Sequence, residues 1–326
     1  MKNEYDLLKV FAILLVVVGH ITILYQDGGL GENEISGLSF FTDFIYLFHM
    51  PLFISISGAI YAIGMQTGKY CKFSPLIINK AKRLLIPFIF VGITCLAPVL
   101  IITGLSENYV MTVVSILTGG TYIKHLWYLP ALFWIFIYAW LICKFRLNLY
   151  IMYIASVSLA VLCSSLAINL NIFCIGNSIQ YLPYFIMGII FYQQRELLQI
   201  KLFPASLIIL CSFAFIQYAS DILWIDNICR ILLPCAILIC IYILVKPIYP
   251  IFNKLPGINY LLKQSYSIYL FHVPIIYLLY IYISHLIPYY AMIPLTFFVA
   301  IIGSAAIATI FRKIHFQIFI GERFSN

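Results

Sequence analysis

Lys9 and His20 lie eleven positions apart on the first apolar segment of the chain. Three turns of an α-helix take nearly eleven residues, so the two side chains share one helix face and stand about 16 Å apart along the axis. An imidazole takes up and releases protons near neutral pH, whereas a lysine presents a positive charge. Ionisable groups at membrane depth are costly and usually functional, so this pair marks a candidate active site.

Three further histidines, His49, His125 and His272, lie in or at the ends of apolar segments. At about 1.5 Å per residue, His20 lies about 20 Å from the inner start of the first segment and His49 about 13 Å from the outer start of the second, so their depths are similar. His125 stands at the outer end of the fourth segment beside Trp127 and can border the same region. His49 and His125 could equally be structural histidines. For His272, a packing network of hydrogen bonds explains its position as well as ligand contact does.

The composition indicates the kind of protein that positions these residues. Hydrophobic residues make up 64% of the 326 residues and charged residues 9%, with a mean hydropathy of +1.05. Soluble domains carry about 25% charged residues. We therefore predict an all-α, polytopic transmembrane helix bundle of about ten spans that forms one domain over residues 1–326. The predicted spans are 7–26, 40–63, 84–104, 126–143, 149–168, 178–193, 202–219, 228–246, 264–284 and 288–311.

The basic residues predict the orientation of these spans. Of the 19 Lys and Arg residues, Lys124 and Arg230 fall on one side and the other 17 fall on the opposite side. An excess of Lys and Arg is typical of cytoplasmic loops, so we expect both termini in the cytoplasm and a multi-pass protein of the cytoplasmic (inner) membrane. The net charge of +8 does not indicate nucleic-acid binding, because the basic residues are not gathered on a face with aromatic stacking positions.

Several other classes of site lack support in the sequence. The nine cysteines include no CxxC pair and no spacing with histidines that is typical of zinc, so we expect no metal. The chain contains no Walker motif, no GxGxxG and no GxSxG, which argues against ATPases, dinucleotide-binding enzymes and α/β-hydrolases.

Five segments in a fixed order resemble the acyltransferase-three family of integral-membrane O-acyltransferases. The segments are YDLLKVFAILLVVVGH (5–20), FHMPLFISISG (48–58), NKAKRLLIP (79–87), LWYL (126–129) and SYSIYLFHVP (265–274). Each segment is weakly specific, but together they extend over most of the chain and fit a ten-helix protein. The resemblance also implies a version without an appended extracytoplasmic domain.

The resemblance assigns roles to particular basic residues. The family carries a basic residue, ten intervening positions and a histidine on its first helix, which correspond here to Lys9 and His20. The family usually has arginine at the first position, and lysine offers a point charge in place of a planar fork. Basic residues at the cytoplasmic start of the third helix are matched by Lys80, Lys82 and Arg83.

The resemblance implies transfer of an acyl group, most often acetyl from cytoplasmic acetyl-CoA, to a hydroxyl of a cell-envelope glycan or lipid-linked sugar. The nucleotide end of acetyl-CoA would lie among the basic residues Lys9, Lys80, Lys82 and Arg83. Its pantetheine arm would bring the thioester near His20. We predict His20 as the general base, contributing about 10²–10⁴ in rate, with His49 as a second catalytic residue that orients the acceptor or His20. Asp43, His125 and Trp127 are the predicted residues for acceptor binding.

Other interpretations remain open at this stage. The positive-inside bias alone can explain the basic residues, and it is the preferred explanation for Lys69 and Lys72. For Lys82 and Arg83, this bias and donor binding explain the positions about equally well. A transporter or flippase for a glycan-lipid or small solute would suit the prolines and histidines within spans. Against transport, no inverted repeat is visible and intramembrane carboxylates are nearly absent, Asp43 being the main one. A non-catalytic membrane scaffold is the third alternative.

Overall fold

The computed structural model describes residues 4–26, 36–70, 72–166, 172–219 and 222–322, and within these ranges the chain is helical without strands. The α-helices along it are α1 (Glu4–Thr22), α2 (Ser36–Gln66), α3 (Phe73–Lys80), α4 (Ile86–Val91), α5 (Ala97–Ile102), α6 (Tyr109–Thr118), α7 (Tyr128–Lys144), α8 (Leu149–Ser165), α9 (Ile175–Gln193), α10 (Phe203–Ala219), α11 (Leu223–Phe252), α12 (Ile258–Ile283) and α13 (Tyr289–Lys313).

Nine stretches of the described chain are long and apolar enough to cross a membrane, so the predicted polytopic helix bundle is confirmed. The remaining predicted span, 149–168, corresponds to α8, whose 17 residues measure about 25 Å, near the lower limit for a membrane span. The short helix α6 was not predicted and lies between the third and fourth long stretches.

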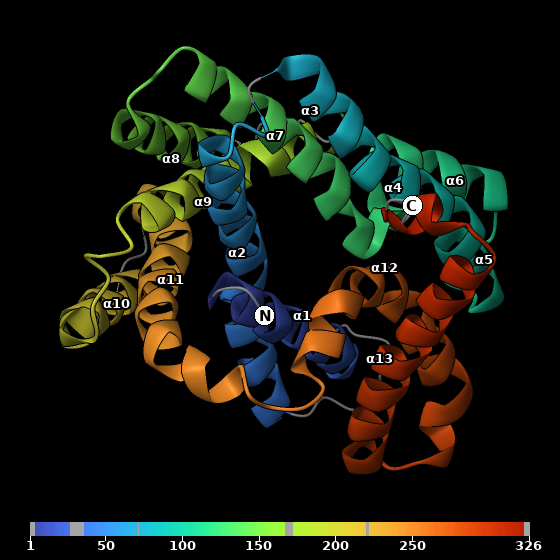
Figure 1. The fold of residues 1–326 in the computed structure, drawn as a ribbon. Helices are drawn as coiled ribbons and strands as arrows, with labels where there is room; N and C mark the ends of the chain where they lie inside the picture. Colours follow the sequence, from blue (N-terminus) through green and yellow to red (C-terminus); the bar gives the residue numbers. More distant parts are fainter. Residues whose placement is uncertain (1–3, 27–35, 71, 167–171, 220–221, 323–326) are drawn as a thin grey trace.

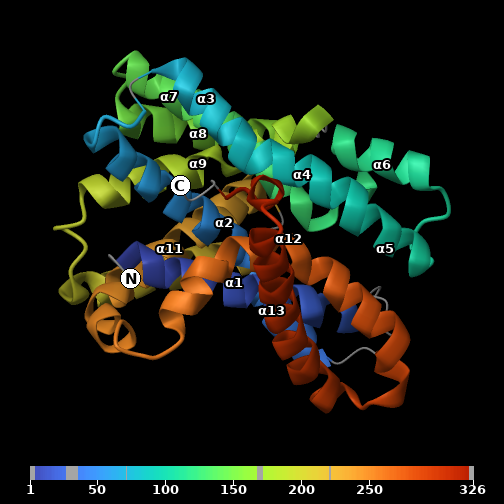
Figure 2. The same cartoon turned by 45° about the vertical axis from the view of Figure 1, so that its right-hand side comes forward.

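The helices surround a central pair. Figure 1 shows α1 and α2 near the middle of the molecule, and α1 packs against α2 and α12. Figure 2 shows α12 and α13 side by side, away from α10, which packs on α11 at the edge of the bundle. Most side chains of α10 face outward, as expected for a helix covered by lipid.

The third long stretch, Phe73–Ile102, begins eleven residues before the predicted start at position 84. It is one helical stretch that contains two wider, π-helical turns, η2 (Ala81–Leu85) and η3 (Gly92–Leu96). Pro87 and Pro98 each follow one of these turns. A proline has no N–H group to donate to the carbonyl four residues earlier, and its ring clashes with that carbonyl. The wider spacing of a π-helical turn makes room for the proline ring.

Glycines allow α2 and α9 to cross at backbone contact. A Cβ atom at Gly58 would overlap the carbonyl oxygen of Phe185, and one at Gly188 would overlap that of Ser55. Small residues at helix crossings let membrane helices approach closely and gain dispersion energy. This crossing fixes α2, which carries His49 and one wall of the candidate site.

Replacing Gly58 with alanine should therefore destabilise the bundle by about 1–3 kcal/mol, because the added methyl group overpacks a backbone contact. The measurement is the melting temperature of the purified protein in detergent. Gly37→Ala on the same helix is the control, since a Cβ there meets nothing within 4 Å. Equal melting temperatures for the two variants would contradict the importance of the crossing.

The two ends of the described chain lie on the same side of the bundle. Asp6 near the start of α1, Lys263 near the start of α12 and Glu322 at the end of the described chain line one cavity. Helices that alternate in direction across a membrane produce this arrangement when their number is even. Which side is cytoplasmic stays a prediction from the basic residues.

Reporter fusions test that orientation. Most Lys and Arg residues lie on the side that carries Thr67 and Asn326, which the positive-inside rule assigns to the cytoplasm. Fusions after Thr67 and at Asn326 should therefore report the cytoplasm, and fusions after Asn33 and Asn171 should report the outer side. Asn33, Asn171 and Asn326 lie outside the described residues. A mixed signal at any of these points would show that the assignment of spans is wrong there.

Candidate active site

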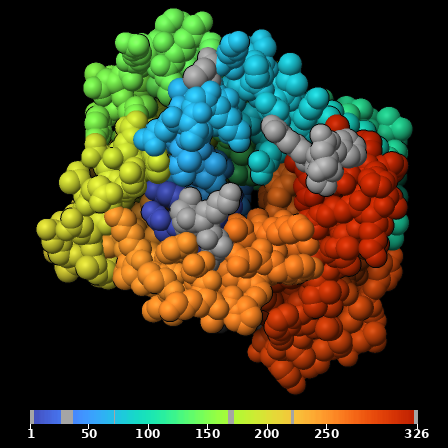
Figure 3. Space-filling view, in the orientation of Figure 1, coloured from blue at the N-terminus to red at the C-terminus, as the bar shows by residue number. Residues whose placement is uncertain are grey.

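A cavity of about 580 Å³ enters the bundle between α1, α2, the third long stretch and α12. Charged residues line it, among them Lys9, Lys80 and the exposed Arg83, which marks its mouth. Ser57 and the buried Tyr128 line it too. Figure 3 shows the hollow near the centre of the face viewed in Figure 1, bordered by blue to cyan and orange atoms. Charge at the mouth and aromatic walls inside fit a ligand with an anionic end and a narrow, less polar arm.

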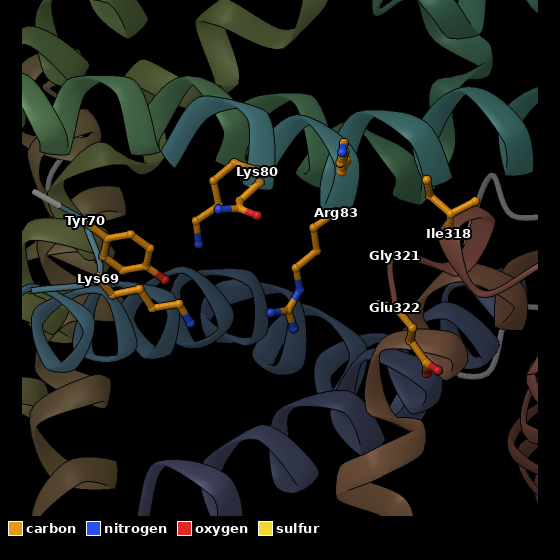
Figure 4. Close-up of a pocket in the computed structure, with 9 residues that line it drawn as sticks. Lys69, Tyr70, Lys80, Arg83, Ile318, Gly321 and Glu322 are labelled. Carbon is orange, nitrogen blue, oxygen red and sulfur yellow. The ribbon is translucent and has the colours of Figure 1, made fainter. Parts of the chain in front are cut away.

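A second cavity of about 740 Å³ adjoins the first, because Lys80, Arg83, Gly321 and Glu322 line both. Lys69 and Lys82 line the second cavity. Figure 4 shows the amino groups of Lys69 and Lys80 and the guanidinium of Arg83 extending into one shared space. All four basic residues predicted to bind the donor therefore line these adjoining cavities. Lys69, for which the positive-inside bias was the preferred explanation, lines one of them too.

Aromatic rings hold the basic side chains in the cavity. The Lys80 Nζ atom lies 3.4 Å from the centroid of the Phe136 ring and 5.1 Å from that of Tyr70. The Arg83 Cζ atom lies 5.9 Å from the centroid of the Tyr266 ring. Ring faces attract cations without neutralising them, and a guanidinium stays protonated in proteins, so the charge of Arg83 remains available to an anionic ligand.

The π-helical turn η2 explains the position of Arg83. Pro87 has no N–H group, so the carbonyl of Arg83, four residues earlier, lacks its usual helical donor. The hydroxyl of Tyr266 donates to that carbonyl at 2.5 Å. Pro87 leaves the carbonyl of Arg83 without a helical donor, and the hydrogen bond from Tyr266 links this turn to α12. Neither the wide turn nor the tyrosine was predicted from the sequence.

Two tyrosines close the inner end of the first cavity. The rings of Tyr128 and Tyr269 lie 5.3 Å apart, and the Tyr128 hydroxyl is 3.1 Å from that of Ser57. The Tyr269 hydroxyl donates to the backbone carbonyl of His125, and the two rings lie 5.6 Å apart. Tyr269 therefore separates the cavity from the histidines by a single side chain.

Three imidazoles gather behind this tyrosine. His20 from α1 lies 5.1 Å from His272 of α12 and 6.2 Å from His125 of η4 (Thr121–Trp127), and His125 and His272 are 5.0 Å apart, all between ring centroids. His125 and His272 are 3% and 0% exposed, whereas His20 is partly exposed. His20 is therefore the member of the group whose side chain is not fully enclosed.

His49 joins this group through Tyr46. The Tyr46 hydroxyl is 3.2 Å from Nδ1 of His20, and its ring lies 4.8 Å from that of His49. His49 is 2% exposed, and its Nδ1 lies 2.8 Å from the carbonyl of Ile45. A carbonyl only accepts, so Nδ1 of His49 carries the proton and Nε2 is the acceptor. The structure thus places His49 near His20 with one tyrosine between them.

The other predicted acceptor-binding residues lie at the edge of this region. Asp43 accepts a hydrogen bond at 2.9 Å from the Gln26 side chain, about 9 Å before His49 along α2. Trp127 packs its ring 4.9 Å from that of Tyr181 on α9. The predicted acceptor-binding set thus separates into His125 inside the histidine group and two residues with other partners.

Matches with known proteins show the family of this chain. A family model described as an acyltransferase domain matches residues 2–313, nearly the whole chain. The chain belongs to the acyltransferase-three family. The chain is also similar to the nodulation protein NolL of Sinorhizobium fredii, with 33% identity over 88 residues. The aligned region covers 26% of this chain and 22% of NolL, so the chain spans about a fifth of that relative. No solved structure matches.

Family membership and the apolar helices together identify a multi-pass membrane protein of the acyltransferase-three family. They favour acyl transfer over the transport and scaffold alternatives. The matched region contains Lys9, His20 and the basic turn of the third stretch.

Proposed function

We propose that this acyltransferase moves an acetyl group from acetyl-CoA to a hydroxyl of a cell-envelope glycan or lipid-linked sugar. The observation that carries the proposal is a cavity with a basic mouth whose inner end lies one tyrosine away from a group of histidines. A donor with a phosphorylated end and a long, thin arm fits this geometry, and an imidazole near the tip of that arm can activate a hydroxyl.

The basic mouth suits the phosphates of acetyl-CoA. Arg83 can form paired hydrogen bonds to a phosphate, and the lysine ammonium groups act as point charges. The walls beyond the mouth include Phe53, Ile60 and Leu132. These apolar side chains can pack against the pantetheine arm and direct the thioester toward Tyr128 and Tyr269.

His20 is the proposed general base. In this mechanism the acceptor hydroxyl gives its proton to His20 while its oxygen attacks the thioester carbonyl carbon. The carbon–sulfur bond then breaks, and the thiolate of CoA receives the proton, which leaves an acetyl ester, free CoA and a neutral His20. General-base catalysis contributes about 10²–10⁴ in rate.

The two substrates meet from opposite sides in this proposal. The basic cavity opens on the side that carries the chain ends, which the positive-inside rule assigns to the cytoplasm. His20 lies about 16 Å further along α1 than Lys9. A glycan acceptor would reach His20 from the outer side of the cytoplasmic membrane, so the acyl group alone crosses most of the bilayer.

Labelled acetyl-CoA tests the proposal directly. Inside-out membrane vesicles that contain the protein should transfer label to a membrane or glycan fraction, and mass analysis of envelope glycans should show added acetyl groups. Vesicles from cells lacking the chain are the control. A transporter or scaffold would consume no acetyl-CoA and would leave the glycan masses unchanged.

A further inference from the structure

Two buried nitrogens in the histidine group have no hydrogen-bond partner among the described residues. They are Nδ1 of His125 and Nε2 of His272. Nε2 of His125 lies 3.2 Å from the carbonyl of Leu270, and Nδ1 of His272 lies 2.9 and 2.8 Å from two carbonyls of its own helix. Because carbonyls only accept, these nitrogens carry the protons and the two unpaired nitrogens are acceptors.

An unpaired buried acceptor is costly, so two of them side by side point to a donor that arrives during the working cycle. His20 is placed to be that donor, because its ring lies 5.1 Å from His272 and 6.2 Å from His125. A neutral imidazole has one N–H group, whereas a protonated one has two. Nδ1 of His20 faces the Tyr46 hydroxyl at 3.2 Å, where it can hold the single proton of the neutral ring. Protonation then adds one N–H group, at Nε2, on a ring that lies beside two acceptors.

The lack of a carboxylate partner for His20 supports this assignment. His20 forms no ion pair with a carboxylate in the part of the chain that the structure describes. Its polar neighbours there are Tyr46 and the two other histidines, with His49 behind Tyr46. A protonated His20 consequently depends on neutral groups for stabilisation.

We propose that His125 and His272 share the N–H group that forms on Nε2 of His20, while Nδ1 stays with Tyr46, so that the three imidazoles together hold the proton taken from the acceptor hydroxyl. The inference rests on the proposed function. One proton enters the group when the hydroxyl oxygen attacks the thioester carbon, and the same proton leaves on the thiolate when the carbon–sulfur bond breaks. His125 and His272 are positioning residues here, because they act through His20.

Repulsion between the rings limits the histidine group to a single proton. Positive charges on rings 5.0–6.2 Å apart repel strongly in a dry interior, so protonation of a second imidazole is opposed.

Paired variants at position 272 test the inference. His272→Leu removes the acceptor and should lower the maximal rate of acetyl transfer to the native membrane acceptor by about 10- to 100-fold, with the apparent KM for acetyl-CoA unchanged. His272→Gln restores an acceptor and should recover the rate to within about threefold of the wild type. His125→Leu and His125→Asn should show the same pattern.

Controls separate this idea from misfolding and from failure of the proposed function. Ser304→Ala also removes a buried unpaired polar atom, on α13, and should leave the rate unchanged. Melting temperatures show whether each variant is folded. If wild type transfers acetyl and His20→Ala does not, yet folded His272→Leu and His125→Leu are fully active, the shared-proton inference is overturned and the proposed function stands. If wild type transfers no acetyl, the proposed function itself fails. Equal losses in the Leu and Gln variants would also overturn the inference, because they would show a need for shape and not for an acceptor.

Discussion

Replacing His20 with alanine should abolish acetyl transfer while the protein still inserts and accumulates in the membrane. The expected loss is about 10²- to 10⁴-fold, the contribution of a general base. The side chain is partly exposed and its Nδ1 faces the Tyr46 hydroxyl at 3.2 Å, so its removal leaves the helix backbone unaffected. The measurement is label transferred from acetyl-CoA per amount of folded protein in vesicles.

His49→Ala is the matched comparison, because it removes a second imidazole of the same region. His49 donates to the carbonyl of Ile45 and reaches His20 only through the ring of Tyr46, so we expect a smaller loss. Full activity of folded His20→Ala protein would contradict its role as the base. A larger loss in His49→Ala than in His20→Ala would exchange the two roles.

The helical repeat was sufficient to predict several features of the site. The spacing of Lys9 and His20 depends only on helix geometry, and apolar runs longer than about 17 residues predict membrane spans. The similar depth of His49 and His20 also followed from counting residues along two antiparallel helices. These predictions needed no knowledge of how the helices pack.

Features that depend on packing between distant segments were beyond the sequence. The prediction left the role of His272 open, because its distance from His20 depends on how α12 lies against α1. Tyr269 and Tyr266 are two of 25 tyrosines, and nothing in their local sequence shows that they bond backbone carbonyls more than 140 positions away.

The start of the third helix was placed too late for a physical reason. Lys80, Lys82 and Arg83 are costly in lipid, so a hydropathy pattern ends the span beside them. In the structure Lys80 and Arg83 face a polar cavity and aromatic rings, and the helix continues through them to Phe73. Lys69, which lies outside any predicted site, lines the adjoining second cavity.

Removing one basic side chain from the cavity should weaken binding of acetyl-CoA. A charge-assisted hydrogen bond contributes about 1.5–3 kcal/mol, which corresponds to a rise of about 10- to 150-fold in the dissociation constant. Lys9→Ala and Arg83→Ala should both show this rise, since both side chains line the first cavity. The measurement is a titration of acetyl-CoA in membranes, with donor affinity separated from maximal rate.

Two further variants decide whether those losses report phosphate contacts or only the orientation of the chain. Lys9→Arg should retain activity, because the guanidinium keeps the charge and the family usually has arginine at this position. Lys72→Ala removes an exposed charge at the N-terminal end of α3, from the same basic side of the bundle, and should leave donor affinity nearly unchanged. Electrostatic attraction that depended only on net charge would weaken equally in Lys9→Ala, Arg83→Ala and Lys72→Ala, and would be screened by salt in all three. A loss confined to Lys9 and Arg83 would instead locate the phosphates at the mouth of the cavity, from which the pantetheine arm extends along α1 toward His20.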